Sequence, residues 1–159
     1  YKRQIQIDFE LAERFDMSYV DADGNKKRPF IVHRSSIGCY ERTLALLIEK
    51  YNGALPAWMM YTQVKVLSLT DRTAAKTEEI TAALRLKGIR AEVDNRSEKV
   101  GFKIREAQLE KIPYMLVVGE KEAETDSVSV RTRKGTDGGA MSVDEFVQMI
   151  CEEIREKRR

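Results

Sequence analysis

The chain has 159 residues, enough for one well-buried domain of about 100 residues and a remainder. Hydrophobic residues make up 42% of it, but no apolar run approaches the roughly 20 residues that cross a bilayer, which excludes a membrane-spanning protein. The net charge is only +2, which excludes a general polyanion binder held by bulk charge. We therefore expect any nucleic-acid contact to depend on the local placement of a few side chains.

Three elements are predicted in the first third of the chain: a strand over residues 3–9, a short strand over residues 30–33 and a helix from about Ser36 to Tyr51. The first strand is predicted because Ile5 and Ile7 alternate with polar residues. The sequence DADGN at residues 21–25 is typical of a turn, and Asn52 with Gly53 is expected to end the helix. The absence of an initial Met and of an apolar leader predicts part of a longer protein without a signal peptide.

The remainder of the chain predicts alternating strands and helices. The expected elements are a strand over 64–69, a helix over 71–87 with Ile80, Ala83 and Leu84 facing inward, a strand over 91–94, a short helix over 104–111, strands over 113–119 and 127–133, and a helix after Ser142. This order predicts an α/β fold with a mixed sheet flanked by about three helices. We expect domains over residues 1–54 and 62–159, joined by a linker over 55–61.

The last helix has the clearest start signal. Ser142 and Glu145 have the spacing of a capping box, and Met141 and Phe146 occupy the positions of a hydrophobic staple. The two cysteines, Cys39 and Cys151, have no spacing typical of a zinc or redox pair, so we expect both to be reduced and partly buried.

Two regions carry family-specific motifs. The sequence HRSSIGCYER, residues 33–42, resembles the last signature motif of the class II aminoacyl-tRNA synthetase catalytic domain. The sequence VGFKIREAQLEKIPYMLVVGEKE, residues 100–122, followed by VSVRTRKG, residues 128–135, resembles the anticodon-binding domain of threonyl-tRNA synthetases. Because two motifs occur in the order of one family, a chance match is improbable.

The resemblance implies part of a cytoplasmic, homodimeric ligase that uses ATP and zinc to join threonine to threonine tRNA. Residues 1–54 would be a strand, strand and helix remnant of the antiparallel catalytic domain, and residues 62–159 the anticodon-binding domain. Motif 1, motif 2 and the editing domain of the family have no counterpart in this sequence. We therefore expect this chain alone neither to aminoacylate tRNA nor to bind ATP or zinc fully.

The resemblance also assigns candidate site residues. His33 matches one of three zinc ligands, Arg42 matches the arginine that lies over the adenine of ATP, and Gln6 matches a strand near the substrate pocket. Without the resemblance, His33 would be interpreted as a structural residue, and Arg42 and Gln6 as parts of solvated faces. A lone histidine supplies too few ligands for zinc, which needs about three protein ligands at a catalytic site.

Glu122 and Arg131 match the family positions that read the G of the threonine anticodon, which is followed by U. Guanine offers N–H donors beside acceptors, so a carboxylate and a cation suit it. The accessory candidates are Lys121, Lys99, Lys111 and Ser97, and phosphate contacts are also expected from Lys103, Arg105 and Arg133. Ser97 and Lys111 stand where asparagine and arginine are common in the family. The alternative interpretation of Glu122 and Arg131 is a cross-strand salt bridge.

Three other functions stay open from the sequence. The chain could belong to a prolyl, histidyl or glycyl enzyme that shares this C-terminal fold. It could instead be a non-catalytic tRNA- or RNA-binding module. A structural protein with a coincidental match would bind no tRNA.

Overall fold

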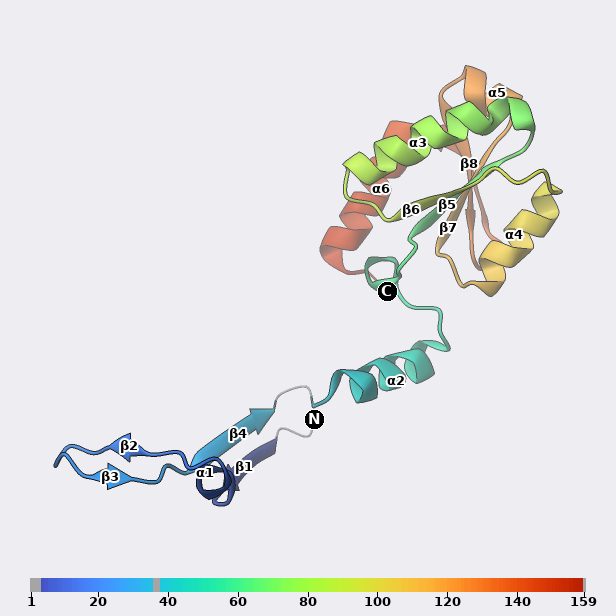
Figure 1. Cartoon of the computed structure of the whole chain (residues 1–159). Coiled ribbons are helices and arrows are strands. Elements are labelled where there is room, and N and C mark those ends of the chain that lie inside the picture. Colours follow the sequence, from blue (N-terminus) through green and yellow to red (C-terminus); the bar gives the residue numbers. More distant parts are fainter. Residues whose placement is uncertain (1–3, 36–37, 159) are drawn as a thin grey trace. The chain divides into compact units, whose positions relative to one another are not determined.

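The structure is a computed structural model that describes residues 4–35 and 38–158 (Figure 1). The chain forms two compact units, Tyr1–Leu47 and Ile48–Arg159, which we describe separately. Helix α2, Tyr40–Tyr51, contains the boundary between them. Over the described residues, every helix is too short or too polar to cross a bilayer.

The first unit contains an antiparallel strand pair and a small hairpin. Its elements are β1 (Gln4–Asp8), α1 (Leu11–Arg14), β2 (Tyr19–Val20), β3 (Lys26–Lys27), β4 (Ile31–Ser35) and the start of α2. β1 pairs with β4, and β2 pairs with β3. The Asp21 carboxylate accepts hydrogen bonds from the N–H groups of Asp23 and Asn25 at 2.9 and 2.8 Å, so the predicted turn forms the hairpin tip. Ile5 and Ile7 are 66% and 58% exposed, so this apolar face is not buried within the unit.

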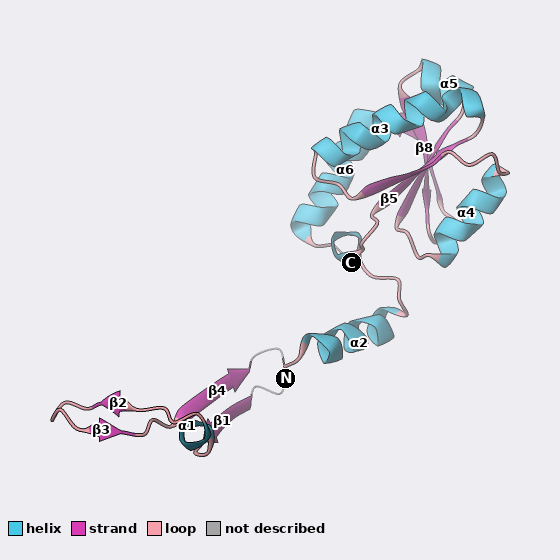
Figure 2. Ribbon diagram, in the orientation of Figure 1, coloured by secondary structure: helices cyan, strands magenta, loops and turns pink. Residues whose placement is uncertain are grey.

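The second unit is an α/β fold around a five-stranded mixed sheet (Figure 2). Its elements are η1 (Ala57–Met59), β5 (Val64–Ser68), η2 (Asp71–Thr73), α3 (Ala74–Leu86), β6 (Ala91–Asp94), α4 (Val100–Leu109), β7 (Tyr114–Val118), α5 (Glu120–Glu124), β8 (Ser127–Thr132), β9 (Asp137–Ser142) and α6 (Val143–Glu156). The strand order is β6-β5-β7-β8-β9, with β5 parallel to β6 and β7, and with β8 antiparallel to β7 and β9. The predicted fold class is confirmed.

Helices cover both faces of this sheet, with α3 and α6 on one face and α4 on the other (Figure 1). Alternate residues of a strand point to opposite faces, so β5 and β7 each supply both cores. Val66 and Leu116 belong to the core with Phe146 of α6, whereas Leu67 and Met115 belong to the core under α4. Because both strands are buried on both faces, β7 is a continuous apolar run in the sequence, whereas β5 also contains the buried polar residues Lys65 and Ser68.

The start of α6 agrees with its sequence signals. Glu145 N–H donates to Ser142 Oγ at 3.2 Å, and Ser142 N–H donates to Glu145 Oε2 at 3.0 Å. This is the predicted capping box. Phe146 and Ile150 are fully buried on the inner face of the helix.

Two helices differ from the prediction in their details. The helix predicted over 104–111 runs from Val100 to Leu109. It begins earlier than predicted because it includes Gly101, although glycine is a poor helix former. It ends before Lys111, whose φ of 63° is not helical. On α3, Ala83 is exposed, whereas Thr77 and Thr81 are buried. Their hydroxyl groups donate to backbone or side-chain oxygens, which makes burial of these polar residues possible.

The predicted burial of one cysteine was also wrong: Cys39 is exposed, while Cys151 is half-buried. The helix predicted from Ser36 begins at Tyr40 in the structure, and residues 36–37 lie outside the described residues. The elements of the described residues that had no prediction are α1, β2, β3, η1, α5 and β9.

Candidate nucleic-acid interface

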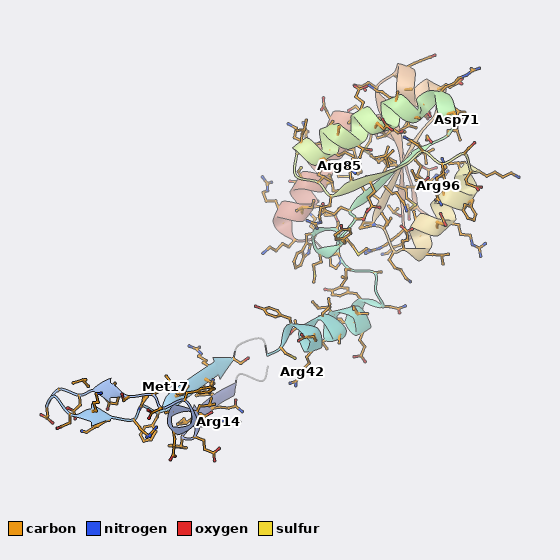
Figure 3. The ribbon with its side chains drawn as sticks, in the orientation of Figure 1. Arg14, Met17, Arg42, Asp71, Arg85 and Arg96 are labelled. Carbon is orange, nitrogen blue, oxygen red and sulfur yellow. The ribbon has the colours of Figure 1, made fainter. Side chains whose placement is uncertain are left out.

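The parallel strands β5, β6 and β7 end at one edge of the sheet in the second unit. The chain passes from β5 through α3 to β6 on one side, and from β6 through α4 to β7 on the other, so the ends of β5 and β7 form a topological switch point. Ligands of open α/β sheets bind outside such a point. A cavity of about 410 Å³ lies at the same edge of the sheet, on the β6 side of β5, between residues 68–71, after β5, and residues 96–99, after β6. Figure 3 labels Asp71 and Arg96, one from each wall.

Side chains fix the ends of β5 and β6 under this cavity. Lys103 of α4 is 1% exposed, and its Nζ donates to Ser68 O, Ser68 Oγ and Asp94 O at 3.0, 3.1 and 3.2 Å. The Arg96 guanidinium donates to both carboxylate oxygens of Asp94 at 2.9 and 2.6 Å. This contact holds the pKa of the Asp94 carboxyl below its usual value, against the opposing effect of burial.

Glu122 lies on α5, immediately after β7. Its Oε2 accepts a hydrogen bond from the Gly119 N–H at 3.1 Å. A Cβ placed on Gly119 would lie 2.8 Å from Glu122 Oε2 and 3.1 Å from Leu69 Cδ2, so the Glu122 carboxylate and the Leu69 side chain both lie next to Gly119. Leu69 also lines the cavity, whereas Glu122 is not one of its lining residues.

Arg131 lies farther down the sheet. On β8 it pairs with Met115 of β7, and its side chain is 43% exposed. Gly119 is four residues beyond Met115, which corresponds to about 13 Å along the strand. Arg131 instead forms an ion pair with Asp137 of β9 at 3.5 Å, and Glu122 bonds to Gly119. Among the described residues, no salt bridge joins Glu122 to Arg131, so that interpretation was wrong.

The accessory candidates separate into two groups. Ser97 and Lys99 line the cavity, and Lys121 is exposed on α5 beside Glu122. Lys111 follows α4 at the opposite end of β7, where its carbonyl accepts a hydrogen bond from Arg133. The structure therefore brings Ser97, Lys99 and Glu122 to one edge and leaves Lys111 at the other.

Two of the expected phosphate contacts have other partners. Lys103 is buried beneath the cavity, so it is not an exposed phosphate contact. Arg133 is half-buried, and its Nη1 donates to Leu55 O at 2.6 Å and to Lys111 O at 3.2 Å. Burial lowers the pKa of the Arg133 guanidinium below its usual value. Arg105, in contrast, is exposed on α4.

In the first unit, Gln6 and His33 are directly opposite each other on β1 and β4. With Asp8 they line a cavity of about 660 Å³, and His33 Nε2 lies 3.6 Å from Asp8 Oδ2. Within the described residues, no three histidine, cysteine or acidic side chains are close enough to hold a metal ion. His33 alone does not fit a zinc site. Arg42 is exposed on α2 (Figure 3).

Comparison with protein families identifies this sheet and its helices. The family model described as "Anticodon binding domain" matches residues 63–153. The chain belongs to the family of anticodon-binding domains. A second model, "tRNA synthetase class II core domain (G, H, P, S and T)", matches residues 3–51, so the anticodon-binding domain follows the end of a class II core.

The relatives of this anticodon-binding domain are threonine–tRNA ligases. The ligase of Clostridium botulinum (strain Eklund 17B / Type B) is 59% identical over 155 residues, which are 98% of this chain and 24% of the ligase. The ligase of Clostridium perfringens (strain SM101 / Type A) is 62% identical over 150 residues, 94% of this chain and 23% of the ligase. The chain thus spans about a quarter of the length of these relatives and corresponds to their C-terminal portion.

Solved structures agree with this family. The RNA binding domain of threonyl-tRNA synthetase from Cryptosporidium parvum Iowa II has a TM-score of 0.73 and 33% identity, covering 93% of this chain and 38% of that chain. Prolyl-tRNA synthetase from Cryptosporidium parvum has a TM-score of 0.68 over 91% of this chain and 31% of that one. At 20% identity, the prolyl enzyme shows the shared fold alone.

Sequence reasoning missed two features of the site. The capping bond from Gly119 to Glu122 belongs to α5, whose five residues carry no helical apolar period. The buried position of Lys103 had no signal, because neighbouring lysines and arginines on the same segment are exposed. The pattern of glycine followed three residues later by glutamate was the one signal that could have located the cap.

Proposed function

We propose that this chain is part of a threonine–tRNA ligase and that its second unit binds the anticodon of threonine tRNA, reading the G and U letters. The observation that carries the proposal is the arrangement of Glu122 and Arg131. Glu122 follows the carboxyl end of β7, the edge where α/β sheets bind ligands, and Arg131 lies beside Met115 near the start of the same strand, about 13 Å from Gly119 along it; no salt bridge joins the two among the described residues.

The chemistry of these two groups suits a guanine between them. A carboxylate accepts hydrogen bonds from the N–H donors of the guanine Watson–Crick edge, and a guanidinium donates to O6 and N7. Because the two side chains do not neutralise each other directly, both keep hydrogen-bonding capacity for a base. Ser97 and Lys99, from the loop after β6, and Lys121, next to Glu122 on α5, would contact the neighbouring nucleotide or phosphates.

The rest of the proposal concerns the longer protein. We propose domains over residues 1–54 and 62–159 joined at 55–61, and a homodimeric, cytoplasmic ligase that uses ATP, threonine and zinc. Arg42 would contact ATP, Gln6 would line the substrate pocket and His33 would be one zinc ligand, with the other ligands supplied outside this chain. No step of catalysis is derived from these residues, because one histidine does not make a zinc site.

Two further candidates are less well supported. A prolyl, histidyl or glycyl enzyme would be expected to resemble its own group more closely than the threonine ligases, which are 59% and 62% identical to this chain. A non-catalytic RNA-binding module would share the cavity and the basic residues but would not require discrimination of the anticodon letters.

The test is binding of the chain to threonine tRNA transcripts at fixed salt, with native G and U letters or with these letters exchanged. Glu122→Ala and Arg131→Ala should each lose about 1–3 kcal/mol of binding free energy for the native transcript. The matched controls are Glu124→Ala, on the same helix as Glu122, and Arg155→Ala, an exposed arginine on α6. Equal affinity for native and exchanged transcripts would contradict the proposal, and equal losses in the controls would reduce it to non-specific binding.

A further inference from the structure

Lys103 is an unusual residue in this unit because it is charged and almost completely buried. Its exposed fraction is 1%, and its three ammonium donors are all used by Ser68 O, Ser68 Oγ and Asp94 O. Among the described residues, Lys103 forms no direct salt bridge, although the Asp94 carboxylate is near enough to attract its ammonium group. The nearby Asp94 carboxylate is taken by Arg96 instead.

Stability does not explain a lysine at this position. Burying a charge without an ion-pair partner is unfavourable, and an apolar residue of similar size is often as stable or more stable. The residue also lies near the start of α4, where a positive charge opposes the helix dipole. A methionine would fill the same space without these costs.

The three hydrogen bonds tie together the two loops that form the cavity. The pairing of β5 with β6 ends at Leu67 and Asp94, and Lys103 joins the next residue, Ser68, to Asp94. One loop continues to Leu69, which is next to the Glu122 carboxylate, and the other continues to Ser97 and Lys99. The relative position of the two walls therefore depends on this buried ammonium group.

We infer that Lys103 is a positioning residue for base recognition, which holds the wall beside Glu122 and the wall with Ser97 and Lys99 at the separation that a nucleotide requires. The inference rests on the proposed function. Lys103 does not touch the RNA and acts through the ends of β5 and β6.

The experiment compares the chain with its Lys103→Met and Ser68→Ala variants, using threonine tRNA transcripts with native or exchanged G and U letters over a range of salt concentrations. Lys103→Met keeps most of the length of the side chain and removes all three hydrogen bonds, whereas Ser68→Ala removes the hydroxyl that accepts from Lys103 and donates to Asp94 O at 3.2 Å. Arg105→Met is the matched control, since it removes one positive charge from the exposed face of the same helix. Thermal unfolding is measured for each variant.

For Lys103→Met we expect the preference for the native transcript to fall about tenfold, with the thermal midpoint unchanged or raised. Ser68→Ala should cause a smaller fall in this preference. Arg105→Met should leave the preference unchanged. The salt dependence of binding should stay unchanged in Lys103→Met, because a residue that contacts no phosphate releases no counterion.

Unchanged preference in Lys103→Met would overturn the inference while leaving the proposed function in place. Unfolding of this variant would also overturn it, since the lysine would then be a requirement of stability. A salt slope lower by about one in Lys103→Met would contradict it as well, by indicating a direct phosphate contact. If the unchanged chain shows no preference for the native transcript, the proposed function and the inference both fail.

Discussion

Glu122 Oε2 accepts the N–H of Gly119 at 3.1 Å, and this bond directs the carboxylate back over the end of β7. The close approach depends on the missing side chain of Gly119. Its φ of −96° is open to any residue, so the requirement for glycine here is one of space and not of backbone conformation.

Gly119→Ala should therefore displace the Glu122 carboxylate and weaken binding of the native transcript by about tenfold. The reason is the 2.8 Å separation between a Cβ at this position and Glu122 Oε2. Gly101→Ala is the control, because no atom lies within 4 Å of a Cβ there and the change should stabilise α4. Binding of the Gly119→Ala variant with unaltered affinity would show that the carboxylate does not need this position.

Arg133→Met should destabilise the second unit by about 1–3 kcal/mol, since the part-buried carbonyl of Leu55 and the exposed carbonyl of Lys111 would lose their donor. Urea unfolding of the whole chain measures the free energy. Lys134→Met removes an exposed charge from the neighbouring position and should change stability little. If both variants unfold at the same urea concentration as the unchanged chain, the Arg133 contacts contribute nothing measurable.

The Asp94 carboxyl should contribute to a pH dependence of stability. Its pKa in the folded state is below the usual value, chiefly because Arg96 hydrogen-bonds to the ionised form. This stabilisation is present above the unfolded-state pKa of about 3.9 and is lost as the pH falls through the lower folded-state pKa.

In Arg96→Met the pKa of Asp94 should rise, and acid unfolding should begin at a higher pH. NMR titration of the Asp94 carboxyl measures the pKa directly, and Arg105→Met should leave it unchanged. A titration curve that does not move in Arg96→Met would show that burial and the backbone contacts, not the guanidinium, determine the pKa of this group.

Much of the second unit could be predicted because local signals agreed with the tertiary structure. β6 has the predicted bounds Ala91–Asp94, and the capping box at Ser142 begins α6 where expected. β9 was missed because its sequence, DGGAMS, contains two glycines and little of the β-branched or aromatic content typical of strands. Its strand conformation comes from pairing with β8, which is a long-range contact that no short window records.

The site was less predictable than the fold. A motif located Glu122 and Arg131, but the position of Arg131 beside Met115, about 13 Å along β7 from Gly119, depends on the register of β8 against β7. The burial of Lys103 depends on where α4 crosses the ends of β5 and β6, which is also a tertiary property. In both cases the sequence shows which residue is present, but tertiary packing determines which groups that residue contacts.

The backbone of residues 55–61 is held by side chains from the body of the second unit. Arg90 donates to the carbonyls of Trp58, Met60 and Tyr61, Gln63 donates to that of Ala57, and Arg133 to that of Leu55. A truncated chain beginning at Thr62 would leave these donors without their acceptors, whereas one beginning at Ala54 would keep every one of them. The family model begins at residue 63, but a second unit cut at that residue would lose these hydrogen bonds. A fragment that is to keep them should begin at or before Ala54.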